Sequence, residues 1–155
     1  MADSGQHLRS IATNRKARHD YEILEELECG VVLTGTEVKS LRAGRASLQE
    51  AYAMVRRGEL WLIGAHIPEY AHGNVHNHEP VHDRKLLVKK KELERLHKRA
   101  REKGFTLVPL EVYFRGALVK VKLGLARGKK QYDKREATRE RDARREMDRA
   151  TRRRR

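Results

Sequence analysis

Residues 107–125 read LVPLEVYFRGALVKVKLGL, two runs of strand-forming residues joined at Arg115-Gly116. In the second run, apolar side chains alternate with Lys120 and Lys122, and this period of two is typical of a half-buried strand. Two such runs around a glycine predict a β-hairpin. We therefore expect an antiparallel hairpin that carries both lysines on its polar face.

The rest of the body is predicted to be mainly β, with a few added helices. A second hairpin is indicated around Arg57-Gly58, from strands at 52–56 and 59–67. Residues 21–33 fit either a helical turn or an alternating strand; we favour strands, with Gly30 as a bulge or bend. Many short strands in about 110 ordered residues favour a small antiparallel barrel. Helices with glycine stops are predicted at 36–44 and 93–104.

The composition restricts the compartment and the class of partner. The chain has 155 residues, a formal net charge of +14 and a single cysteine, Cys29, which excludes an internal disulfide and a cysteine-based zinc site. No apolar run approaches the roughly 20 residues of a membrane span, and Met1–Ser10 lacks the apolar core of a secretory signal. We expect a cytoplasmic protein with no membrane partner, whose positive charge favours nucleic acid.

Residues 127–155 differ sharply from the rest of the chain. They carry 14 basic and 6 acidic side chains, a net charge of +8, and contain no Val, Ile, Leu, Phe or Trp. Such a segment buries too little apolar surface to offset the entropy of ordering, so we expect it to be disordered in the free protein. The predicted organisation is a flexible N-terminus at 1–13, a folded domain at 14–126 and a basic tail at 127–155.

The residues that could bind a metal or carry catalysis form no recognisable constellation. His72, His76, His78 and His82 fall in a polar segment that gives no rigid scaffold for a metal, so we expect solvated imidazoles. Acidic neighbours oppose a reactive thiolate at Cys29, and we expect a core residue there. The chain is predicted to be no enzyme and to need no cofactor; a histidine-metal hydrolase is the alternative.

Four blocks of sequence, in consistent order between Ala12 and Arg135, point to one known family. They are HDYE at 19–22, GTEVKSLRAG at 35–44, RKLL at 84–87 and GLARGKKQYDKR at 124–135. These residues resemble the small protein B family, the SsrA-binding proteins of bacterial trans-translation. The resemblance implies an OB-like, closed, six-stranded antiparallel barrel with added helices, followed by the basic tail.

The same resemblance implies a function in ribosome rescue. The protein would bind the tRNA-like domain of transfer-messenger RNA (tmRNA), with alanyl-tRNA synthetase and elongation factor Tu as associates through that RNA. On a stalled ribosome it would take the place of the missing anticodon arm. Its tail would lie in the empty messenger channel, against the small-subunit rRNA of the decoding centre. There it would be helical, because rRNA phosphates neutralise the repulsion between its arginines.

The resemblance also implies which residues do this. Asn14, Glu28 and Lys120 would face the tRNA-like domain: Asn14 can pair with base edges or a 2′-hydroxyl, Lys120 with phosphate, and ionised Glu28 with a base amino group or ribose hydroxyl. Basic segments supply further candidates for phosphate contacts: Arg15, Lys16, Arg18, Lys39 and Arg84. The resemblance assigns these tail residues to the ribosomal decoding region: Arg127, Lys129, Lys130, Tyr132, Asp133, Lys134 and Arg135.

One stretch departs from the family pattern. Where the family commonly shows Asp-Pro-x-Arg-x-Arg, residues 79–84 read EPVHDR, with His82 in place of the first arginine. One arginine expected to face phosphate is therefore lost or replaced by a pH-dependent charge. The alternative function is a general RNA binder that uses the same barrel and tail without specificity for a tRNA-like fold. Equal displacement by bulk tRNA and ribosomal RNA would favour it.

Overall fold

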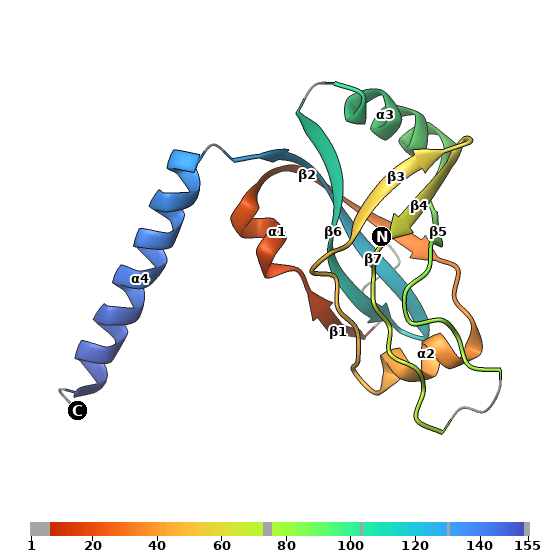
Figure 1. Cartoon of the computed structure of the whole chain (residues 1–155), viewed down its shortest axis with the longest axis horizontal. Coiled ribbons are helices and arrows are strands. Elements are labelled where there is room, and N and C mark those ends of the chain that lie inside the picture. Colours follow the sequence, from red (N-terminus) through yellow and green to blue (C-terminus); the bar gives the residue numbers. More distant parts are fainter. Residues whose placement is uncertain (1–6, 73–75, 103, 130, 154–155) are drawn as a thin grey trace.

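The computed structural model describes residues 7–72, 76–102, 104–129 and 131–153, without the side chains of 131–137 and 151–153. An antiparallel sheet curls around one core, and the last helix extends away from it (Figure 1). The described elements follow in this order: β1 (Leu8–Thr13), α1 (Arg15–Asp20), β2 (Tyr21–Val31), α2 (Gly35–Arg42), β3 (Tyr52–Arg56), β4 (Glu59–Ile63), β5 (Arg84–Leu87), α3 (Lys90–Ala100), β6 (Phe105–Arg115), β7 (Leu118–Gly128) and α4 (Gln131–Arg153).

The strands form a circuit of antiparallel pairings around the β6–β7 hairpin. β7 pairs with β6 on one side and β2 on the other, and the order β6–β3–β4–β5–β2–β7 returns to β6. The mainly β, OB-like fold with added helices is thus confirmed, and six strands make the predicted barrel circuit. Two strand pairings in this circuit are short. β3 and β6 are joined by the single pair Ala53↔Leu107, and β2 and β5 are joined by two pairs.

A seventh strand corrects the prediction for the N-terminus. Residues 1–13 were expected to be flexible, but Leu8–Thr13 forms β1 and pairs with β6 from Leu8↔Arg115 to Thr13↔Glu111. The polar composition of residues 8–13 does not indicate a strand, because what orders this segment is its pairing with β6. The backbone groups along that edge of β6 need hydrogen-bond partners, and Ile11 also packs against the core. Residues 1–6 lie outside the described part.

The core fills the inside of the barrel and is closed at one end by α3. Leu107, Leu123 and Leu125 of the central hairpin are each 1% exposed, and Leu96 of α3 packs against them. A smaller cluster lies on the other face of the hairpin, where Ala17 of α1 contacts β6 and β7. Both predicted hairpins and both predicted helices are present, but β4 ends at Ile63 and not at residue 67, and α3 begins at Lys90, three residues earlier than predicted. The bulge expected at Gly30 is wrong: the register shift in β2 lies between Ile23 and Glu25.

The boundary between body and tail lies slightly later than predicted. β7 continues to Gly128, and Ala126 is fully buried, so the folded unit does not end at residue 126. The backbone N–H of Lys129 donates to the Asp20 carbonyl. The tail that follows is α4, the helical form expected on the ribosome, whereas its disorder in the free protein stays a prediction. None of the described helices has the length and apolar character needed to cross a bilayer.

Candidate nucleic-acid interface

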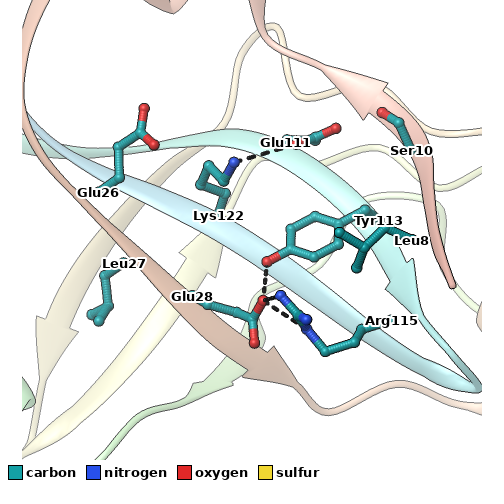
Figure 2. A pocket seen from close by; sticks show the side chains of 9 residues that line it. All are labelled: Leu8, Ser10, Glu26, Leu27, Glu28, Glu111, Tyr113, Arg115 and Lys122. Atoms are coloured by element: carbon teal, nitrogen blue, oxygen red, sulfur yellow. Dashed lines mark hydrogen bonds and ion pairs between the residues drawn. The ribbon is translucent and has the colours of Figure 1, made fainter. Parts of the chain in front are cut away.

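A groove of about 500 Å³ opens on the outer side of the sheet, where β1, β2, β6 and β7 lie together (Figure 2). Helix α1 covers the adjoining part of β6 and β7, where Ala17 packs in a cluster with Val108 and Ala126. The exposed cations of α1 therefore lie beside the groove. These residues line it: Leu8, Ser10, Glu26, Leu27, Glu28, Glu111, Tyr113, Arg115 and Lys122.

Glu28 is the central acceptor of this groove. Its Oε2 accepts hydrogen bonds from the Tyr113 hydroxyl and from Nε and Nη2 of Arg115, the latter two at 3.1 and 2.7 Å. Burial alone would raise the pKa of the Glu28 carboxyl, but the bonds from Tyr113 and Arg115 outweigh it and lower that pKa. Burial and the Glu28 carboxylate raise the pKa of Tyr113. At neutral pH, Glu28 is ionised and the phenol keeps its proton.

β7 brings two lysines to the same surface. In the sheet register, Lys122 lies opposite Glu28 and Glu111, and Lys120 lies opposite Tyr113. The Lys122 Nζ is 3.8 Å from Glu111 Oε1 and 6.0 Å from the Tyr113 ring centroid. The positive charge of Lys120 also lowers the pKa of Glu28. The alternation seen in the sequence therefore placed both lysines correctly, on the face that carries the groove.

Asn14 has a structural task that the sequence did not reveal. It is 5% exposed and caps α1, where its Oδ1 accepts from the Ala17 N–H at 3.1 Å. Its amide Nδ2 donates to the carbonyls of Leu48 and Pro109, at 3.1 and 2.9 Å. Because both ends of the amide are used inside the protein, the expected pairing of Asn14 with RNA is not available in this conformation. Asn14 instead fixes where α1 begins.

The other α1 candidates lie at the surface, as expected. Arg15, Lys16 and Arg18 are exposed on α1. The Arg18 guanidinium is 3.1 Å from Glu26, a residue of the groove, which ties this cation to its rim. Lys39 is exposed on α2 and does not line the groove, and its Nζ lies 5.7 Å from the Tyr70 ring centroid.

Arg84 is the second correction to the predicted site. It is 1% exposed, its Nε lies 2.5 Å from Glu37 Oε2, and its Nη1 donates to the Ala65 carbonyl at 2.8 Å. His82 contacts the same carboxylate, with Nε2 2.9 Å from Oε2. Arg84 therefore holds the segment between β4 and β5 against α2 and faces no phosphate. The sequence missed this because arginine is seldom fully buried unless paired.

The tail candidates divide into two groups. Arg127 lies 2.5 Å from Glu22, and the Lys129 Nζ donates to the Arg18 carbonyl at 3.2 Å. Arg127 thus connects β7 to β2, and Lys129, just after β7, bonds to α1. Lys130 lies outside the described residues. The remaining candidates are in α4, with side chains outside the described part: Tyr132, Asp133, Lys134 and Arg135.

Neither the histidines nor the cysteine form a reactive site in the described part. No group of three or more metal-ligating side chains comes together there. His78 is buried, bonded through its ring nitrogens to Thr36 and the Ile67 carbonyl, so the expectation of a solvated imidazole is wrong for it. Cys29 is 1% exposed and burial raises its pKa to about 12, which confirms a core residue.

Tyr113 and Arg115 are the groove residues that sequence reasoning missed. Both come from β6, and both bond to Glu28 of β2, reaching over β7, which lies between the two strands. The usable signal was the predicted 107–125 hairpin: alternation puts Tyr113 and Arg115 on the same face of their strand. Their partner Glu28 on β2 could not be predicted, because local alternation does not show which strands are neighbours in the sheet.

Comparison with known proteins gives a consistent result. The family model described as SmpB protein matches residues 11–153. The chain is 56% identical to an SsrA-binding protein of Thermobifida fusca over 153 residues, covering 99% of this chain and 96% of the relative. It is 59% identical to an SsrA-binding protein of Acidothermus cellulolyticus over 148 residues, covering 96% and 92%.

A solved structure shows the same fold. It is described as "tmRNA-SmpB: a journey to the center of the bacterial ribosome". The likeness has a TM-score of 0.67 at 49% identity and covers 83% of this chain and 94% of the solved one. The family model covers residues 11–153, and the two relatives are 56% and 59% identical to this chain, which is enough to assign the family. The chain belongs to the SmpB family, the SsrA-binding proteins.

Proposed function

We propose that this chain binds the tRNA-like domain of tmRNA through the groove between β1, β2, β6 and β7 and the exposed face of α1. The observation that carries the proposal is the Glu28–Arg115–Tyr113 cluster, set beside Lys120, Lys122 and the cations of α1. Support comes from membership of the SmpB family and from the tmRNA–SmpB assembly described for the similar structure.

The groove combines two kinds of contact. The lysines and arginines attract phosphate and set position, which makes binding salt-dependent but carries no sequence information. Glu28 adds a group that repels phosphate and accepts hydrogen bonds from base amino groups or 2′-hydroxyls. The bonds that Glu28 accepts from the described residues all end on Oε2, so Oε1 keeps acceptor capacity toward RNA. Because the Glu28 carboxylate lies among cations, the groove favours an RNA that places a hydrogen-bond donor at Glu28 and phosphates at the cations. A polyanion without such a donor should bind less well.

The finer steps of ribosome rescue belong to the same proposal. The basic tail would lie in the empty messenger channel of a stalled ribosome and license decoding without a codon. Alanyl-tRNA synthetase and elongation factor Tu would act on the same tmRNA, and the reaction chemistry would be theirs and the ribosome's. The net charge of +8 over residues 127–155 and the helical form of α4 support a tail that binds along rRNA.

Fluorescence anisotropy with a labelled tRNA-like domain tests the RNA part. We expect bulk tRNA and ribosomal RNA to displace this probe only at concentrations far above those of unlabelled tRNA-like domain. Glu28→Ala should lower that discrimination, while Lys98→Ala on the exposed side of α3 should leave it unchanged. Equal displacement by all three RNAs would replace the proposal with a general RNA binder.

Truncation tests the division between body and tail. A chain ending after Lys129 keeps the whole of β7 and the Lys129–Asp20 backbone bond. It should bind the tRNA-like domain like the full chain and fail to support peptide tagging on stalled ribosomes. A chain ending after Leu125 is unsuitable, because it removes the buried Ala126 and part of β7. Loss of RNA binding in the Lys129 truncation would contradict the division.

A further inference from the structure

A second depression lies on the β3–β4 hairpin, which is yellow in Figure 1 and lies on the opposite side of the molecule from α4. It measures about 510 Å³ and is lined by Arg56, Arg57, Glu59 and Trp61, which we call the hairpin site. None of these residues lines the groove described above. Trp61 is the only tryptophan of the chain.

Two planar groups, the Arg56 guanidinium and the Trp61 ring, lie together in the hairpin site. The Arg56 guanidinium lies over the Trp61 ring, 5.0 Å from its centroid, and is tied by Nη2 to Asp83 at 3.0 Å. Trp61 points outward because the residues on either side of it in β4, Leu60 and Leu62, are buried in the core. Aromatic faces and guanidinium planes are the surfaces on which unpaired nucleobases stack.

The turn beside this stack carries an arginine in an unfavourable place. Arg57 has a φ of 52° and Gly58 a φ of 73°, as a two-residue hairpin turn requires. Asn, Asp or Gly normally occupies the first position, because other side chains are strained there. Arg57 is exposed, and no carboxylate among the described residues pairs with it. A strained, unpaired cation at the rim of a pocket indicates a binding role.

The flanks of the hairpin site supply an apolar margin and an acceptor. Met54 and Lys85 pair with Trp61 across the sheet, and Met54 is 38% exposed. Glu59 is half-exposed, with Oε2 3.6 Å from the Lys85 Nζ, so its carboxylate can also accept from an N–H group of a ligand. A planar group with N–H donors and an attached anion matches this pattern, and a nucleotide has all of these parts.

We propose that the hairpin site binds one unpaired RNA nucleotide. Its base stacks on the Arg56–Trp61 pair, a base N–H group donates to Glu59, and Arg57 contacts the phosphate. Every base has a planar face and an N–H donor, so the site tolerates any sequence and prefers purines, which stack over a larger area. This contact goes beyond the proposed function, because it lies on other strands and requires no tRNA-like fold.

Trp61 fluorescence tests the proposal in the full-length protein. Hexa-adenylate RNA should quench the emission in a saturable way, hexa-uridylate should bind several-fold more weakly, and a 12-base-pair RNA duplex should not quench. RNA held only by cations elsewhere on the chain does not report at this residue. Absence of quenching by hexa-adenylate, or equal quenching by the duplex, would overturn the proposal.

Two variants locate the effect. Arg57→Glu should weaken hexa-adenylate quenching about tenfold, because it replaces the phosphate contact with a repulsive charge. The matched control is Arg99→Glu, which makes the same charge reversal outside the hairpin site, at an arginine that lies over Phe105, 5.4 Å from the ring centroid. We expect no change for the control, and equal effects of the two variants would overturn the assignment. Circular dichroism checks that both variants fold, and binding of the tRNA-like domain, measured separately by anisotropy, shows whether the groove still works.

Discussion

Two of the protein's glutamate–arginine pairs have the same chemistry but lie in different surroundings. In the first, Glu37 and Arg84 have side chains 1% and 0% exposed. In the second, Glu28 and Arg115 are 34% and 18% exposed and line the groove. Sequence reasoning assigned both Arg84 and Glu28 to RNA. Only Glu28 has a surface from which it can reach a ligand.

The difference shows that burial, rather than residue type, separates a structural ion pair from an interface pair. Arg84 donates hydrogen bonds to Glu37 and to the carbonyls of Ala65 and Pro80, so the donors of this pair are used inside the protein. Glu28 accepts its bonds from the described residues on Oε2, and its side chain is 34% exposed. Substitutions in the buried pair should therefore lower stability, whereas substitutions in the groove should weaken RNA binding.

Arg84→Ala should destabilise the fold most. It leaves the Glu37 carboxylate buried without its main partner, which typically costs about 3–5 kcal/mol. Urea unfolding at neutral pH should show this loss, whereas Lys39→Ala on the exposed side of α2 should change stability by less than about 0.5 kcal/mol. An Arg84→Ala protein that is as stable as the parent but binds RNA weakly would show that Arg84 is a contact after all.

Asn14 extends the comparison between buried structural residues and RNA contacts to an uncharged side chain. Asn14→Ala removes the helix cap and two buried hydrogen bonds, and should cost about 2 kcal/mol. Asn14→Asp keeps the cap acceptor but lacks the Nδ2 donors for Leu48 and Pro109. Chemical denaturation should therefore find Asp destabilised as well. If Asp is as stable as the parent, capping alone explains the residue. Reduced RNA affinity at unchanged stability would restore Asn14 as an RNA contact.

The contrast between buried and exposed pairs also explains which parts of the fold and site could be predicted from the sequence. Alternation around Arg57-Gly58 and Arg115-Gly116 predicts both hairpins, because exposure repeats every second residue in a half-buried strand. β1 is missed because its stability comes from the free edge of β6, a partner about a hundred residues away. Asn14 and Arg84 are misplaced because their residue types are usually exposed, and only the fold brings buried acceptors to them. Lys120 lies on the outer face that alternation predicts, and Glu28, which the resemblance assigns, lines the groove; their contacts with RNA stay predictions.

The pH dependence of stability tests what the Glu28 carboxylate gains from its partners. Hydrogen bonds and nearby arginines lower the pKa of both carboxyls from 4.5 against the opposing effect of burial. As pH falls below that ordinary value, the unfolded chain takes up protons before the folded one, so stability is present at neutral pH and is lost on acidification. Urea titrations from pH 6 to pH 3 should show a shallower loss in Glu28→Gln than in the parent. An unchanged slope would mean that Glu28 gains nothing from Arg115.

Lys120→Ala should have the smallest effect on stability and the most specific effect on binding. Lys120 is half-buried beside the groove, and among the described residues no carboxylate lies within ion-pair distance of its ammonium group. Its removal should weaken binding of the tRNA-like domain a few-fold and reduce the slope of log K against log salt by about one, since one phosphate contact is lost. Anisotropy at several salt concentrations measures both quantities, with Lys98→Ala as the control. An unchanged slope would place the RNA elsewhere, whereas a large loss of stability would make Lys120 a structural residue like Arg84.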